Sequence, residues 1–108
     1  MAPRYLVQLQ HRVRTEDLPA LPDGLVAEFW DTYAYVLTVD PKGCSGYPSH
    51  DLRGRLTGYR ALEIDFEDTP YRLVYRVCDS PAPRRVEVVS FDVHDSAYEK
   101  AVERLGKN

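Results

Sequence analysis

Residues 69–77, TPYRLVYRV, constrain the fold of this chain more than any other stretch of its sequence. Successive side chains of a β-strand leave opposite faces, so every second residue of this stretch shares a face. One face carries Tyr71, Leu73, Tyr75 and Val77. The opposite face carries Arg72 and Arg76 on either side of a valine. Because the first face is apolar, we expect it to pack on the core of a sheet, which leaves the two arginines on the other face.

Hydrophobic periodicity and turn residues divide the rest of the chain into a few elements. Alternation predicts strands at residues 4–10, 59–66, 71–79 and 84–93. Helical spacing and prolines predict a helical pair at 14–22 and 23–38 and a short helix from residue 94 onward. We therefore predict one α+β domain over residues 1–108. The N-terminal strand and the helical pair pack on a mostly antiparallel four-stranded sheet with a short C-terminal helix. With helices on one face, the face of Arg72 and Arg76 is expected to be open.

The segment 23–38 carries the strongest helical pattern of the chain. Its apolar residues recur at helical spacing over about four turns, from Leu25 to Leu37. We expect this stripe to cover the apolar face of the sheet, with Phe29 and Trp30 both in the core.

Composition is that of a globular domain with one core, because 44% of the 108 residues are hydrophobic and 29% are charged. No apolar run approaches the roughly 20 residues that span a bilayer, and the N-terminus has no secretion signal. We therefore expect a cytoplasmic protein that does not enter a membrane. Cys44 and Cys78 do not form a CxxC pair or a Cys/His cluster, so we expect reduced thiols and neither a metal nor a cofactor.

Charge is unevenly distributed along the chain. The net charge of −3 argues against a nucleic-acid partner. However, residues 15–40 hold six acidic side chains and no Lys or Arg, while basic residues gather in 42–60 and in the strand after residue 70. If the basic segments meet in space, they form a basic cleft on an acidic protein.

The stretch LTGYRALEIDFEDTPYRLVYRV, followed by a further strand, resembles the RelE/ParE toxin superfamily of bacterial toxin–antitoxin modules. The resemblance is specific over 52–77, and the order of elements extends it over about residues 4–105. The likeness is greatest to the YoeB-like branch, in which the corresponding strand also reads RLVY and a histidine follows the last strand. The resemblance implies a RelE-like fold. It also implies an mRNA interferase, a ribosome-dependent endoribonuclease that represses translation and is neutralised by a cognate antitoxin.

The resemblance also implies site residues. A base before the leucine–glycine lead-in falls on His50, the arginine of RLVY is Arg72, and the acid after the last strand is His94. We expect RNA contacts from Arg53, Arg55, Arg76 and Tyr98, with the alternative that Arg53 and Arg55 only keep the loop soluble. The chain departs from the family pattern in three places. His50 replaces a carboxylate, Asp92 stands where an arginine is common, and Asp95 stands where a tyrosine is common, a phenol that Tyr98 could supply one helical turn later.

These residue types suit the cleavage of RNA by its own 2′-hydroxyl. The reaction needs a base for that hydroxyl, an acid for the leaving 5′ oxygen and positive charge on the phosphorane between them. Histidine as a residue type serves either proton-transfer role near neutral pH. Arginine offers a planar, permanently charged fork to phosphate oxygens, so no metal is required.

Structural interpretations of the same residues stay open. His50 could be an exposed loop residue, and His94 could belong to a helix start. Arg72 and Arg76 could pair across the hairpin with Glu63, Asp65 or Asp68.

Two functions of different classes therefore remain: the ribonuclease, and a non-catalytic member of the same fold. The second is a ParE-like gyrase inhibitor or a degenerate binding module, and the acidic net charge favours it. The partners implied are an antitoxin and ribosome-bound mRNA, with a homodimer or a toxin–antitoxin hetero-oligomer as the assembly. We expect an antitoxin segment to cover the helix or the open face and to bring carboxylates to Arg72 and Arg76.

Overall fold

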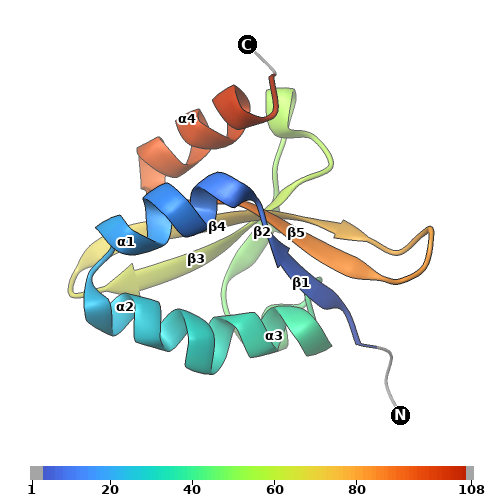
Figure 1. Ribbon diagram of the computed structural model, residues 1–108, viewed down its shortest axis with the longest axis horizontal. Helices are drawn as coiled ribbons and strands as arrows, with labels where there is room; N and C mark the ends of the chain where they lie inside the picture. The colour runs from blue at the N-terminus through green and yellow to red at the C-terminus, as the bar shows by residue number, and fades with distance from the viewer. Residues whose placement is uncertain (1–3, 107–108) are drawn as a thin grey trace.

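The computed structural model describes residues 4–106 and shows helices packed on a twisted sheet (Figure 1). The strands of the sheet are β1 (Leu6–Leu9), β2 (Ser49–Asp51), β3 (Arg60–Phe66), β4 (Thr69–Cys78) and β5 (Arg85–Val93). Their order is β1-β5-β4-β3-β2, in which β1 runs parallel to β5 and every other neighbouring pair is antiparallel. The α+β class and the mostly antiparallel sheet are confirmed. The predicted number of strands is wrong, because the sheet formed by the described residues has five.

The additional strand is β2, in a segment that the sequence indicated to be a loop. It has three residues and no apolar alternation, so local pattern does not reveal it. It forms by antiparallel pairing with the edge of β3, where His50 lies opposite Ala61. This pairing places His50 next to β3, the strand that pairs on its other side with β4 and Arg72.

The helices are α1 (Leu18–Ala20), α2 (Asp23–Glu28), α3 (Ala34–Val39) and α4 (His94–Arg104). A π-helical turn, Phe29–Tyr33, joins α2 to α3, so that residues 23–39 form one continuous helical segment. This segment lies along one face of the sheet (Figure 1). Leu25, Phe29 and Leu37 are fully buried in the same apolar cluster as Leu73 and Tyr75. The predicted packing of this helix on that face is confirmed.

The expectation that Trp30 lies in the core is wrong. Trp30 is 51% exposed, whereas the adjacent Phe29 is 0% exposed. The two rings meet edge to face with their centroids 4.9 Å apart. Neighbouring helix positions are separated by about 100° around the axis, so only one of two consecutive aromatic residues can point at the sheet.

We expect Phe29→Ala to lower the free energy of unfolding by about 3–5 kcal/mol, because it empties a fully buried aromatic site. Trp30→Ala should lower it by about 1 kcal/mol or less, since it removes an aromatic contact at the surface. Urea unfolding of both variants measures the difference. Equal losses would contradict this assignment of the core residue.

The second face of the sheet is also covered, which corrects the expectation of an open face. There α4 packs through its small residues Ala97 and Ala101 on Val74 and Val89. These two valines form a second apolar stripe, and its exposure to water would be unfavourable. The Arg72 side chain, which shares this face, is only 13% exposed. The expectation that an antitoxin segment covers an open sheet face is therefore not supported, because α4 already covers that face.

A buried carboxylate fastens α4 to the rest of the domain. Asp17 is 1% exposed and lies in the π-helical turn Val13–Asp17. Both of its oxygens accept hydrogen bonds from Arg104, at 2.7 and 2.8 Å, and Lys100 and the Phe91 backbone N–H also donate to it. Burial alone would raise the pKa of Asp17, but the hydrogen bonds from Arg104, Phe91 and Lys100 together lower it.

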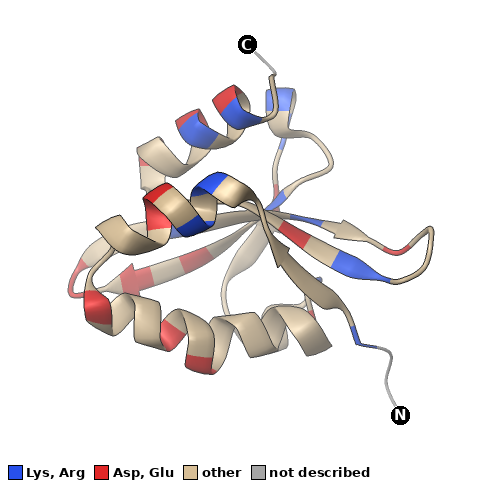
Figure 2. Ribbon diagram, in the orientation of Figure 1, with Lys and Arg blue, Asp and Glu red and all other residues tan. Residues whose placement is uncertain are grey.

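Negative charge follows α2 and the adjoining π-helical turn, on the side of the sheet away from α4 (Figure 2). The acidic residues there are Asp23, Glu28 and Asp31. Across residues 4–106, the structure contains no helix with the length and apolar character needed to cross a membrane.

Candidate active site

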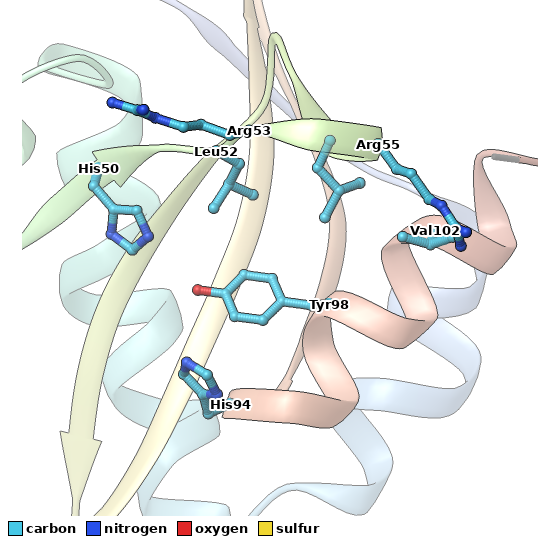
Figure 3. A pocket seen from close by; sticks show the side chains of 8 residues that line it. His50, Leu52, Arg53, Arg55, His94, Tyr98 and Val102 are labelled. Atoms are coloured by element: carbon cyan, nitrogen blue, oxygen red, sulfur yellow. The ribbon is translucent and has the colours of Figure 1, made fainter. Parts of the chain in front are cut away.

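A cavity of about 500 Å³ opens between α4 and the loop that follows β2 (Figure 3). Its lining is formed by His50, Leu52, Arg53, Arg55, Leu56, His94, Tyr98 and Val102. Both candidate catalytic histidines therefore lie on the same side of the sheet and border one space. A proton relay around a common substrate requires such an arrangement.

His50 lies in β2 at the edge of the sheet. Its side chain is 46% exposed, and its Nδ1 lies 3.1 Å from Oε2 of Glu63 on the neighbouring strand β3. This contact leaves Nε2 of the ring available to another group. The side chain is thus partly fixed and still reachable from solvent.

Arg72 lies in β4, directly opposite Glu63 in the β3–β4 pairing. Its Nη2 is 3.5 Å from Oε1 of Glu63, and its Nη1 donates a 2.9 Å hydrogen bond to the Tyr71 carbonyl oxygen. Among the described residues its buried Nε has no hydrogen-bond partner. The guanidinium is therefore held on one side by a single, rather long ion pair. The proposed pairing of Arg72 with Glu63 across the hairpin is confirmed.

His94 and Tyr98 lie on the first turns of α4, one turn apart on the same side of the helix. Their rings meet edge to face, with centroids 5.0 Å apart. Nδ1 of His94 lies 2.7 Å from Oδ1 of Asp95. Figure 3 shows the Tyr98 hydroxyl pointing toward the side of the cavity on which both histidines lie.

Tyr98 also connects this helix to Arg72. Burial raises the pKa of the Tyr98 phenol, while the charge of Arg72 and a hydrogen bond from it act in the opposite direction. His50 on β2 and Arg72 on β4 thus share Glu63 as a contact, and His94 on α4 contacts Tyr98, whose phenol is influenced by the charge of Arg72. The two histidines border one cavity, and Arg72 lies on the same face of the sheet without lining that cavity.

The remaining basic residues implied to bind RNA are divided between the cavity and another surface. Arg53 and Arg55 border the cavity, one near His50 and the other beside Val102 (Figure 3). Arg76 lies outside it, because its Nη2 is 2.6 Å from Oε1 of Glu87 and its guanidinium lies over the Tyr59 ring. The tertiary structure thus gives Arg76 an internal ion pair with β5 and no contact with the two histidines.

Two features of this site were not singled out from the sequence as functional. Glu63 appeared only as a structural partner for Arg72, because its contact with His50 depends on the unexpected strand β2. Asp92, at a position where an arginine is common, pairs with Lys100 at 2.7 Å. Within the described part of the chain, no three His, Cys, Asp or Glu side chains gather closely enough to hold a metal ion.

Solved structures similar to this chain include two bacterial toxins. A doubly substituted variant of the Escherichia coli toxin RelE in the free state superposes with a TM-score of 0.64 at 21% identity, over 94% of this chain and 98% of that one. The YoeB/ParE toxin from Agrobacterium tumefaciens gives a TM-score of 0.54 at 20% identity, over 82% of this chain and 98% of that one. The chain has the RelE/ParE toxin fold. This confirms the fold that the sequence resemblance implied. Neither a family model nor a curated protein sequence matches the chain.

Proposed function

We propose that this protein is the toxin of a type II toxin–antitoxin system and cleaves mRNA on the ribosome without a metal ion. The observation that carries the proposal is that His50 and His94 border one cavity, while Arg72 contacts Glu63, the carboxylate that also contacts His50. A purely structural role would not require two half-exposed histidines near a mostly buried arginine. The RelE/ParE fold supports the same conclusion by analogy.

The mechanism assigns one role to each residue. Nε2 of His50 takes the proton of a ribose 2′-hydroxyl, whose oxygen attacks the adjacent phosphorus. Arg72 stabilises the additional negative charge of the phosphorane. His94 gives a proton to the departing 5′ oxygen, so the products are a 2′,3′-cyclic phosphate and a free 5′-hydroxyl. Tyr98 contacts His94 and borders the same cavity, and its hydroxyl is proposed to donate to the same phosphate.

Flanking nucleotides would lie along the loop after β2. Arg53 and Arg55 border the cavity there, and their permanent charge suits contacts with phosphates on either side of the scissile bond. Because the net charge of the protein is −3, its overall charge does not attract RNA, and the local positive charge of these two arginines would have to bind the substrate. Binding to the ribosome would add the remaining affinity. The antitoxin is the proposed protein partner, and the protein is proposed to act in the cytoplasm.

A non-catalytic role of the same fold is the second candidate, and one contact favours it. Arg72 already has a carboxylate partner in Glu63, so its charge is partly compensated before any phosphate binds. A gyrase inhibitor or binding module would retain the fold without needing the histidines. Mapping of transcript ends after toxin induction, beside a DNA supercoiling assay, separates the two: new 5′-hydroxyl ends in mRNA support the ribonuclease, and a supercoiling block without them supports the alternative.

Arg72→Gln is expected to reduce the rate of RNA cleavage by about 10²–10³-fold, because it removes a preorganised group that stabilises charge in the transition state. The measurement is cleavage of mRNA on programmed ribosomes with purified protein. Glutamine is used because Arg72 is mostly buried, so that truncation to alanine would leave a cavity beside α4.

Arg85→Gln is the matched control for this variant. Arg85 is a β5 arginine that pairs with Glu87 at 3.2 Å and does not border the cavity. The Arg85→Gln variant loses the same charge as Arg72→Gln and should cleave RNA at the wild-type rate. Full cleavage by Arg72→Gln, or equal loss in both variants, would remove Arg72 from the mechanism.

A further inference from the structure

Glu63 contacts two of the three candidate catalytic residues at the same time. Its Oε2 lies 3.1 Å from His50 Nδ1, and its Oε1 lies 3.5 Å from Arg72 Nη2. We propose that Glu63 is a positioning residue, which fixes the proton-accepting form of His50 and holds Arg72 until a phosphate replaces the carboxylate. This inference rests on the ribonuclease function proposed above.

The sheet explains why one carboxylate reaches both partners. Glu63 lies in the middle of β3, which is flanked by β2 on one side and β4 on the other. Glu63 lies directly opposite Arg72 of β4. His50 of β2 pairs with Ala61, two residues before Glu63, and is therefore the diagonal neighbour of Glu63. Directly opposite and diagonal neighbours of adjacent strands share a face and lie within reach of long side chains. The register of β2 and β4 thus creates the bridge.

The contact with His50 selects a tautomer of the imidazole. A neutral imidazole carries one N–H, and a carboxylate next to Nδ1 favours the form with the proton on that nitrogen. Nε2 then carries the lone pair that accepts a proton from the 2′-hydroxyl. Without Glu63, the proton is free to occupy Nε2, and the ring also loses its fixed orientation.

The contact with Arg72 is loose enough to be exchanged. Its 3.5 Å separation is longer than the 2.6 Å of the Arg76–Glu87 pair on the same sheet. A doubly hydrogen-bonding phosphate is the stronger partner for a guanidinium. Glu63 therefore competes with the substrate for Arg72 while it assists His50, and its removal should lower turnover without weakening substrate binding.

Steady-state cleavage kinetics test this pair of effects. Glu63→Ala should lower kcat by about 10–100-fold, by analogy with the carboxylates that orient metal-bound histidines. KM should stay constant or fall. Glu63→Gln keeps an oxygen that accepts from Nδ1 and should retain more of kcat than Glu63→Ala. Asp65→Ala removes an exposed carboxylate two residues further along β3 and should leave both constants unchanged. A wild-type kcat in Glu63→Ala, or a fall in kcat accompanied by a rise in KM, would overturn the proposal.

A readout without RNA separates this inference from the proposed function. Long-range ¹H–¹⁵N spectra of the histidine rings report which nitrogen of His50 carries the proton, and His50→Gln assigns its signal. The wild type and Asp65→Ala should show the Nδ1–H form, and Glu63→Ala should shift His50 toward a mixture of tautomers. An unchanged His50 tautomer in Glu63→Ala would overturn the positioning role even if the wild type cleaves RNA. A wild type that cleaves no RNA would defeat the ribonuclease, while these spectra would still decide whether Glu63 positions His50.

Discussion

His94→Gln is expected to lower the rate of RNA cleavage by about 10²–10⁴-fold, the usual contribution of a positioned acid or base. Glutamine can still donate a hydrogen bond in the cavity, but it cannot transfer a proton to the departing 5′ oxygen near neutral pH. The His94 side chain is 46% exposed at the start of α4, so the fold should tolerate the change. Single-turnover cleavage of mRNA on programmed ribosomes measures the loss.

Two controls make this prediction specific. His11→Gln changes the remaining histidine, which is exposed and does not border the cavity, and should cleave at the wild-type rate. An RNA with sulfur in place of the bridging 5′ oxygen has a leaving group that needs little protonation, so His94→Gln should cleave it almost as fast as the wild type does. If the sulfur substrate is cleaved as poorly by His94→Gln as the natural one, His94 is not the acid.

Asp17→Ala is expected to lower the free energy of unfolding by about 3–5 kcal/mol, which is typical of breaking a buried ion pair. Its partner Arg104 has a side chain that is only 1% exposed and would be left with a buried charge and no carboxylate at hydrogen-bond distance. Glu16→Ala is the control, because Glu16 is an exposed neighbour paired with Arg12 at 2.6 Å. An exposed pair of this kind contributes about 1 kcal/mol or less. Urea unfolding near pH 7 compares the two variants, and similar losses would contradict a buried anchor for α4.

The pH dependence of the same variant provides a second check. Asp17 has a lower pKa in the folded protein than its ordinary value, so it stabilises the fold above that ordinary value. This contribution is lost as pH falls through the folded pKa. The difference in stability between the wild type and Asp17→Ala should therefore be largest near neutral pH and decrease in acid below about pH 4. A difference that grows on acidification would contradict the ionised state of Asp17.

Local periodicity in the sequence determined those strands and helices whose apolar residues recur at regular spacing. Alternation over 69–77 correctly divided β4 between the core and the face of Arg72, because side-chain direction on a strand depends only on parity. Helical spacing over 23–38 correctly placed a helix on the core face. The pairing of Arg72 with Glu63 could also be foreseen, since a short hairpin turn at Glu67 and Asp68 sets the register of β3 and β4.

The candidate site was accessible from the sequence only through the resemblance. His50, Arg72 and His94 are separated by more than 20 residues along the chain, and no local periodicity relates them. The tertiary structure alone decided that His50 and His94 border one cavity, that Glu63 contacts both His50 and Arg72, and that Tyr98 contacts His94. Such contacts depend on the order and register of strands, which are set by the packing of the whole sheet.

Three further features came from tertiary structure for the same reason. The edge strand β2 has no pattern of its own and exists through hydrogen bonds with β3. The choice of Phe29 over Trp30 as the core residue depends on how the helix is rotated against the sheet, which spacing alone leaves undetermined. Asp17 and Arg104 are 87 residues apart and read as surface residues, yet both are buried. The sequence alone determined that the face of Leu73 and Tyr75 is apolar, whereas only the tertiary structure showed the second apolar stripe of Val74 and Val89 beneath α4. The packing of distant elements determined which charges are buried together, because burial of a charge becomes favourable only when its partners arrive from elsewhere in the chain.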